Sequence, residues 1–126
     1  MISKDTAQKL ADEWIEAWNS HNIDQIISQY SDDVVFTSPF VAKLLGDESG
    51  AISGKEALKS LFTKALEEYP DLKFEFHDVL IGVNSLTLLY KSVNELLAAA
   101  VITLDSEGKI VKSILHFSIN ASNTDN

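Results

Sequence analysis

The sequence predicts a single α+β domain, in which helices cover one face of a curved antiparallel sheet. The chain has 126 residues, which is the usual size of one domain. Residues 5–20 and 54–68 repeat apolar side chains at helical spacing, and residues 73–119 form β-type runs separated by short turns. Because strands joined by short turns pair antiparallel, we expect the order ααβαββββ over residues 1–119.

The first helix is expected over residues 5–20, because its apolar side chains form one stripe along the helix. Asn22 is suited to cap a second, short helix that extends to Tyr30. Ser31 to Asp33 would end that helix. The stripe of the first helix comprises Leu10, Ala11, Trp14, Ala17 and Trp18.

The middle of the chain predicts a strand, a long loop and a third helix. Residues 34–38 are rich in β-branched and aromatic residues, and Pro39 stops that strand. Residues 39–54 read as a loop, and a loop this long in a small domain is often functional. The Ser53 to Glu56 segment matches a capping box, so a helix is expected over 54–68.

Four strands follow, over residues 73–83, 86–93, 96–104 and 109–119. A two-residue turn at Asn94 and Glu95 would place Tyr90 opposite Ala99. A bulge at Gly108 would instead exchange the two faces of the last strand. Residues 120–126 read as a flexible C-terminal tail.

Both faces of these strands are mostly apolar, yet the helices can cover only one of them. An apolar face without a cover is best explained by a partner subunit, so the sequence predicts a homodimer. The interface expected on the outer face comprises Tyr90, Ala99, Val101, Ile114 and His116.

Composition excludes several classes of function. The net charge of −9, from 10 basic and 19 acidic residues, disfavours nucleic acid as a partner. The chain has no cysteine, and its three histidines have no metal-ligand spacing, so we expect no metal and no cofactor. No apolar run is long enough to span a membrane, and the N-terminal segment is unlike a secretory signal, which favours a cytoplasmic location.

Two segments resemble the nuclear transport factor 2-like (NTF2-like) superfamily, and its SnoaL-like branch in particular. The first runs from Trp14 to Pro39 and includes Tyr30-Ser31-Asp32-Asp33-Val34-Val35-Phe36; the second is Ser53-Gly54-Lys55-Glu56-Ala57-Leu58. The resemblance covers about residues 5–119. It implies a cystatin/NTF2-like cone, with a strongly bent sheet around the long first helix, a pocket at one end and dimerisation through the outer sheet face. Members of the superfamily include ketosteroid isomerases, polyketide cyclases, dehydratases, epoxide hydrolases and non-enzymatic binders.

The ketosteroid isomerase pattern is absent at three positions. Ser38 stands where that branch needs a carboxylate base, and a serine hydroxyl is too weak a base for the reaction. Trp14 stands where that branch has a tyrosine, and Ala100 where it has an acid. No match to the Asp–Arg–Asp arrangement of the epoxide hydrolases is found either.

The remaining signal is a wall of aromatic residues. Trp14 and Trp18 lie one turn apart on one helix face, which fits either core packing or a pocket for a flat, apolar ligand. Small side chains at residues 98–100 would leave volume inside the cone. The leading hypothesis is therefore a pocket for a small apolar or aromatic organic molecule. The expected lining residues are Trp14, Trp18, Phe36, Ser38, Phe40, Phe62, Ala100, Ser113, Leu115 and Phe117.

Two other hypotheses stay open. The first is an isomerase, cyclase or lyase with an untypical site, in which Asp78 or His116 acts as acid or base and Ser38 orients the substrate. The second is a non-catalytic dimerisation module. The sequence does not decide whether the protein is an enzyme.

Overall fold

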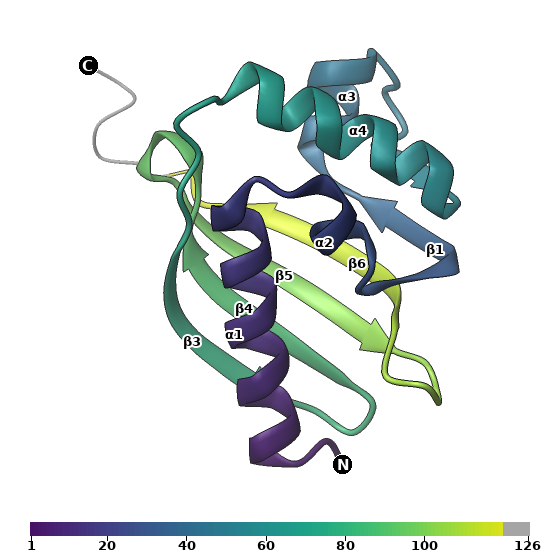
Figure 1. Ribbon diagram of the computed structural model, residues 1–126, viewed down its shortest axis with the longest axis vertical. Helices are drawn as coiled ribbons and strands as arrows, with labels where there is room; N and C mark the ends of the chain where they lie inside the picture. The colour runs from purple at the N-terminus through teal and green to yellow at the C-terminus, as the bar shows by residue number, and fades with distance from the viewer. Residues whose placement is uncertain (120–126) are drawn as a thin grey trace.

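The computed structural model describes residues 1–119 and consists of a curved six-stranded sheet with helices against its concave face (Figure 1). The α+β class and the predicted order of the elements are confirmed, with three short additional elements: α3, β2 and the 3₁₀ turn η1 (Val93–Glu95). The elements are α1 (Lys4–Ser20), α2 (Ile23–Ile27), β1 (Tyr30–Thr37), α3 (Pro39–Leu45), β2 (Ala51–Ser53), α4 (Lys55–Glu68), β3 (Glu75–Ile81), β4 (Ser85–Lys91), β5 (Leu97–Leu104) and β6 (Ile110–Phe117). The predicted C-terminal tail, residues 120–126, lies outside the described residues.

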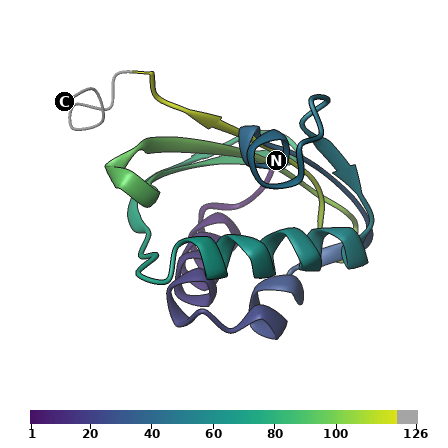
Figure 2. The ribbon, with the colours of Figure 1, turned by 90° about the horizontal axis from the view of Figure 1, so that it is seen from above.

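The strand order of the sheet is β2-β1-β6-β5-β4-β3. Neighbouring strands are antiparallel except β1 and β6, which are parallel. Figure 2 shows the strands arching over α1, α2 and α4, so that the helices fill the concave side. The domain core, and the space left within it, therefore lie between this concave face and the helices.

Helix α1 follows from local sequence signals. Ser3 caps its start, because its hydroxyl accepts a hydrogen bond from the Thr6 N–H. The buried stripe of α1 faces the sheet. Beyond its last turn, His21 adopts a left-handed conformation, with φ of 60°. The buried residues of α1 are Ala7, Ala11, Trp14, Ala17 and Trp18.

The end of α1 is joined to the segment that enters β3. The Asn19 side-chain amide donates to the Phe74 carbonyl over 2.9 Å, and its oxygen accepts from the Phe74 N–H over 2.6 Å. The His21 imidazole Nε2 lies 2.7 Å from the Leu72 carbonyl oxygen. These contacts hold residues 72–74 against the helix although they are more than 50 positions away in the sequence, and so they fix Phe74 in the core.

Three predictions for the middle of the chain are wrong. Tyr30 begins β1 and does not end the second helix. The segment predicted as a loop contains α3, which Ser38 caps and Pro39 begins, because a proline fits the first turn of a helix. The N-cap of α4 is Gly54 and makes no side-chain cap bond, so the predicted capping box is not formed.

The predicted register between β4 and β5 is wrong by one residue. The turn has three residues and not two, and Asn94 and Glu95 both adopt positive φ values, of 56° and 58°. Tyr90 consequently pairs with Ala98 and lies on the concave face, where it is only 1% exposed. Its predicted place on the outer face is therefore wrong, because a shift of one residue turns each side chain of a strand to the other face.

The faces of β5 and β6 are as predicted, although their register differs by two residues. Ala99 pairs with His116, and Val101 pairs with Ile114. The irregularity in this pair lies between Thr103 and Leu104 and not at Gly108. The convex face thus carries four of the five residues predicted for an interface. Across residues 1–119, no helix has the length and apolar character needed to cross a bilayer.

Candidate functional site

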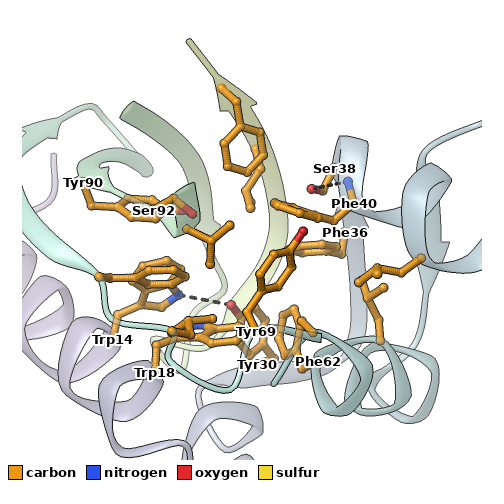
Figure 3. Close-up of a pocket in the computed structure, with 18 residues that line it drawn as sticks. Trp14, Trp18, Tyr30, Phe36, Ser38, Phe40, Phe62, Tyr69, Tyr90 and Ser92 are labelled. Atoms are coloured by element: carbon orange, nitrogen blue, oxygen red, sulfur yellow. Dashed lines mark hydrogen bonds between the residues drawn. The ribbon is translucent and has the colours of Figure 1, made fainter. Parts of the chain in front are cut away.

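The concave face and the helices enclose an apolar cavity of about 50 Å³, measured as the space that the centre of a water molecule can reach. Ten of the eleven aromatic residues of the chain line it, and Figure 3 shows eight of them, labelled, gathered around one space. Seven of these ten also belong to the buried hydrophobic core and the other three pack against it, so the cavity and the core share their side chains. The lining residues are Trp14, Trp18, Tyr30, Phe36, Ser38, Phe40, Leu44, Leu61, Phe62, Ala65, Tyr69, Leu72, Phe74, Tyr90, Ser92, Val93, Leu115 and Phe117.

The structure places eight of the ten residues predicted for a pocket on this wall. Ala100 and Ser113 are buried on the concave face but do not line the cavity. The sequence interpretation missed Tyr30 and Tyr90 through the errors in element boundary and register described above. The eight residues are Trp14, Trp18, Phe36, Ser38, Phe40, Phe62, Leu115 and Phe117.

Two tryptophans and a tyrosine form the polar part of the inner wall. Trp14 Nε1 donates a hydrogen bond to the Tyr30 hydroxyl oxygen over 3.1 Å, and both residues are buried. Trp18 Nε1 is also buried, and no hydrogen-bond partner is found for it within residues 1–119. Figure 3 shows the Tyr30 hydroxyl beside both indoles. An unpaired N–H in such a place costs free energy, which marks this part of the cavity as incompletely satisfied.

Burial keeps the tyrosines of the inner wall protonated. Burial raises the pKa of Tyr30 well above its usual range, and the indole N–H groups of Trp14 and Trp18 beside its hydroxyl offset only part of that rise. Burial also raises the pKa of Tyr90, and the neighbouring Tyr30 raises it further. Both hydroxyls are therefore neutral hydrogen-bonding groups across the physiological range.

The mouth of the cavity is formed by aromatic rings that are only partly buried. Phe40 packs edge-on against Tyr69 and Phe117, with ring centroids 5.8 and 5.1 Å apart. Lys43, one turn further along α3, donates to the Tyr69 hydroxyl, and its Nζ lies 5.2 Å from the Tyr69 ring centroid. The hydrogen bond from Lys43 therefore holds the Tyr69 ring at the entrance.

Ser38 has a structural role that its sequence position alone does not reveal. It is 1% exposed, and its hydroxyl oxygen accepts a hydrogen bond from the Phe40 N–H over 3.1 Å. This bond caps α3 and orients Phe40 at the mouth. Ser38 lines the cavity, but it stands among apolar neighbours with no base beside it.

The other two acid–base candidates lie outside the cavity. A bulge between Phe76 and Asp78 places Asp78 opposite Leu89 on the convex side, whereas a strand without a bulge would place it on the same side as Phe76. Its exposed carboxylate accepts a hydrogen bond from the Val79 N–H. His116 is exposed on the same convex side. The wall of the cavity contains no Asp, Glu, His, Lys or Arg side chain.

The described part of the chain also holds no group of three His, Asp or Glu side chains arranged as metal ligands. A second hollow, of about 330 Å³, lies between the start of α1 and the β5–β6 turn. Lysines and glutamates share its rim, and one of the lysines, Lys109, donates to the Ser28 carbonyl. Its mixed surface character contrasts with the aromatic cavity, which is the better-formed candidate site.

The comparisons agree with this architecture. The family model of the SnoaL-like domain matches residues 11–112. A crystal structure of a SnoaL-like protein of unknown function from Burkholderia thailandensis is 35% identical, with a TM-score of 0.90 over 93% of this chain and 98% of that chain. No curated protein matches the sequence at a significant level.

Two more distant structures share the fold alone. The epoxide hydrolase/cyclase-like enzyme SalBIII, described in pyran ring formation in the polyether salinomycin, is 16% identical, with a TM-score of 0.76 over 96% of this chain and 97% of that one. A protein with a cystatin-like fold from Methylobium petroleophilum is also 16% identical, with a TM-score of 0.73 over 99% and 84% of the two chains. Together with the family match, the long first helix and the curled sheet show that this chain belongs to the SnoaL-like family, within the NTF2-like superfamily.

Proposed function

We propose that the protein binds a small, mainly apolar organic molecule in the aromatic cavity. The observation that carries this proposal is the gathering of ten of the eleven aromatic side chains around one unfilled space. Protein cores normally pack without voids larger than a water molecule, because each unfilled void loses dispersion contacts. A void surrounded by rings is therefore better explained by a ligand than by a core that is simply loose.

The size of the cavity limits the ligand. A volume of about 50 Å³ is small beside the roughly 300–1,000 Å³ of pockets for drug-sized molecules. It is also about a third of the roughly 150 Å³ of a cavity known to hold benzene, so a ligand of one ring enters only when the mouth opens. Rotation of Phe40, Tyr69 and Phe117, which are partly exposed, would enlarge the entrance without disturbing the buried rings behind them.

Binding is favoured over acid–base catalysis by the lining of the cavity. The SnoaL-like fold is shared with an epoxide hydrolase/cyclase-like enzyme, but a shared fold does not carry over the activity. General acid–base chemistry needs a titratable group within hydrogen-bond reach of the substrate. Here Asp78 and His116 lie on the far side of the sheet, and the titratable groups on the wall are tyrosines, two of them with raised pKa values.

Filling the cavity should abolish binding, and toluene is a suitable probe of one ring. We expect toluene to raise the unfolding midpoint of the wild type and of Ala57→Leu, but not that of Ala65→Leu. Both alanines lie on α4, yet Ala65 lines the cavity while Ala57 is exposed. Toluene at about ten times its Kd would stabilise a binding protein by about 1.4 kcal/mol. Thermal unfolding measures the shift, and native mass spectrometry reports any ligand retained from purification. Equal behaviour of the three proteins would contradict the proposal.

We further propose that a second copy of the chain covers the convex face, as the sequence predicts. Ala99, Val101 and Ile114 form an apolar patch on β5 and β6, which are the two central strands of the sheet. We expect Val101→Glu to convert a dimer into a monomer, because a carboxylate would be buried unpaired in the interface. Val83→Glu, at the exposed β3–β4 turn, should leave the dimer intact. Light scattering after size-exclusion chromatography measures the masses, and a monomeric wild type would refute this assembly. A cytoplasmic location stays a prediction.

A further inference from the structure

The direction of the hydrogen bond between Trp14 and Tyr30 is fixed by chemistry. An indole N–H can only donate, so the Tyr30 hydroxyl oxygen must be the acceptor over the 3.1 Å that separates the two atoms. A phenol that accepts such a bond still has one proton of its own to donate. Because the oxygen is occupied on the side of α1, that proton must be directed away from Trp14.

No acceptor for the Tyr30 proton is found among residues 1–119. Within these residues, the hydrogen bond found for the Tyr30 hydroxyl is the one it accepts from Trp14. The neighbouring Trp18 indole can only donate, so it cannot accept the Tyr30 proton. Trp18 Nε1 is itself buried and unpaired. The Tyr30 hydroxyl and the Trp18 indole thus lack an acceptor within residues 1–119, as do the hydroxyls of Tyr90, Ser38 and Ser92 on the same wall, although buried donors in proteins are nearly always paired. Tyr30 differs from the other hydroxyls of the wall in that an indole N–H occupies its oxygen and so directs its proton.

The surroundings of these donors favour a neutral acceptor. The wall of the cavity holds no Lys, Arg or His side chain to compensate an anion, and the chain as a whole carries a net charge of −9. Burial raises the pKa of Tyr30, so its proton is retained and available. An anion would lose its hydration on entry without gaining a counter-ion.

We infer that the ligand is an uncharged molecule of about one ring with a carbonyl-type oxygen, which accepts a hydrogen bond from the Tyr30 hydroxyl at the inner wall of the cavity. This inference rests on the proposed binding function and assigns Tyr30 as the residue that determines ligand specificity. Trp14 is a positioning residue, because it occupies the Tyr30 oxygen and so directs the proton toward the ligand. Trp18 offers its N–H to the same region.

Three probes of one shape test this assignment. Acetophenone has the carbonyl, α-methylstyrene replaces the carbonyl oxygen with a methylene group, and benzoate carries a charge. We expect Tyr30→Phe to weaken acetophenone binding about tenfold, which corresponds to about 1.4 kcal/mol, while α-methylstyrene changes less than about twofold. Isothermal titration calorimetry measures each Kd. Benzoate should bind the wild type more weakly than acetophenone.

Tyr90→Phe is the matched control, since it removes a buried hydroxyl from another part of the same wall and leaves the Trp14–Tyr30 bond intact. This variant should affect acetophenone and α-methylstyrene by the same small factor. If Tyr90→Phe causes the selective loss, or if Tyr30→Phe weakens both probes equally, the assignment of Tyr30 is overturned. Tighter binding of benzoate than of acetophenone would overturn the neutral class of ligand.

A measurement on the wild type alone covers the case in which Tyr30→Phe fails to fold. The infrared carbonyl stretch of bound, ¹³C-labelled acetophenone should lie below its position in hexane, because a hydrogen-bond donor weakens the C=O bond. A band at the hexane position would overturn the inference while toluene binding still supported the proposed function. If the wild type bound neither toluene nor acetophenone, both proposals would fail together.

Discussion

Replacing Trp14 with alanine is expected to lower the free energy of unfolding by about 3–5 kcal/mol, the range found when a large buried aromatic side chain is truncated. Trp14 is 3% exposed. Its ring stacks on Phe74 at a centroid distance of 5.6 Å and meets the Tyr90 ring edge-on at 5.0 Å. The substitution also removes the hydrogen bond to Tyr30. Urea denaturation followed by circular dichroism measures the change.

Two variants separate packing from the hydrogen bond. Trp14→Phe keeps a ring in the core but loses the N–H, so we expect a loss of about 1–3 kcal/mol, smaller than for alanine. Ile15→Ala, at the next and only partly buried position of α1, controls for the change in the helix itself. The importance given to Trp14 would be refuted if Trp14→Ala cost no more than Ile15→Ala.

The sequence was sufficient for those elements that local signals define. The apolar stripe of α1 and the cap at Asn22 involve residues a few positions apart, and both are present in the structure. By contrast, the parallel pairing of β1 with β6 brings together segments about 80 residues apart, and no local pattern specifies it. Asn19 and Phe74 are also far apart in the sequence, by 55 positions, so the position of Phe74 at the cavity could not be predicted.

The errors at the site have one physical origin: successive side chains of a strand point to opposite faces of the sheet, so one extra residue exchanges the faces. A three-residue turn in place of a two-residue turn moved Tyr90 from the outer face to the cavity. A bulge before Asp78 placed its carboxylate on the convex face and not on the side of the cavity. Neither Asn94 nor Glu95 is a residue that demands a particular turn length, although Asn tolerates positive φ well. Much of the aromatic wall was nevertheless predicted. Trp14 and Trp18 lie on one face of helix α1 because of helical spacing, and turns or bulges in the strands do not change that spacing.

These corrections change the chemistry attributed to the cavity. With Tyr90 inside and Asp78 outside, the polar groups of the wall are hydroxyls and indoles, which donate hydrogen bonds but do not exchange protons near neutral pH. The SnoaL-like fold therefore presents here a site suited to recognition of a neutral, flat molecule. A catalytic carboxylate would have to be supplied from outside the lining residues.

Alkaline conditions should destabilise the protein strongly, because its two innermost tyrosines cannot ionise while buried. Burial raises the pKa of Tyr30 and of Tyr90 above the value of 10 that a tyrosine has when exposed, as in the unfolded chain. Above about pH 10 the unfolded chain releases these protons and the folded chain does not, so rising pH favours unfolding. The stabilising effect is complete below that pH. At about pH 11 the loss is about 1.4 kcal/mol for each tyrosine, or roughly 3 kcal/mol for the pair.

Urea denaturation at a series of pH values measures this loss, and phenolate absorbance near 295 nm follows the ionisation directly. We expect the absorbance of Tyr30 and Tyr90 to appear together with unfolding and not before it. Tyr90→Phe should remove about half of the additional slope of stability against pH, since each buried tyrosine contributes one proton to the difference between the two states. Lysines titrate in the same range, but they do so in both proteins, so the difference between wild type and variant isolates the tyrosine. An unchanged slope in Tyr90→Phe would mean that water reaches this hydroxyl in the folded protein, and the cavity would then be wetter and more open than its aromatic lining indicates.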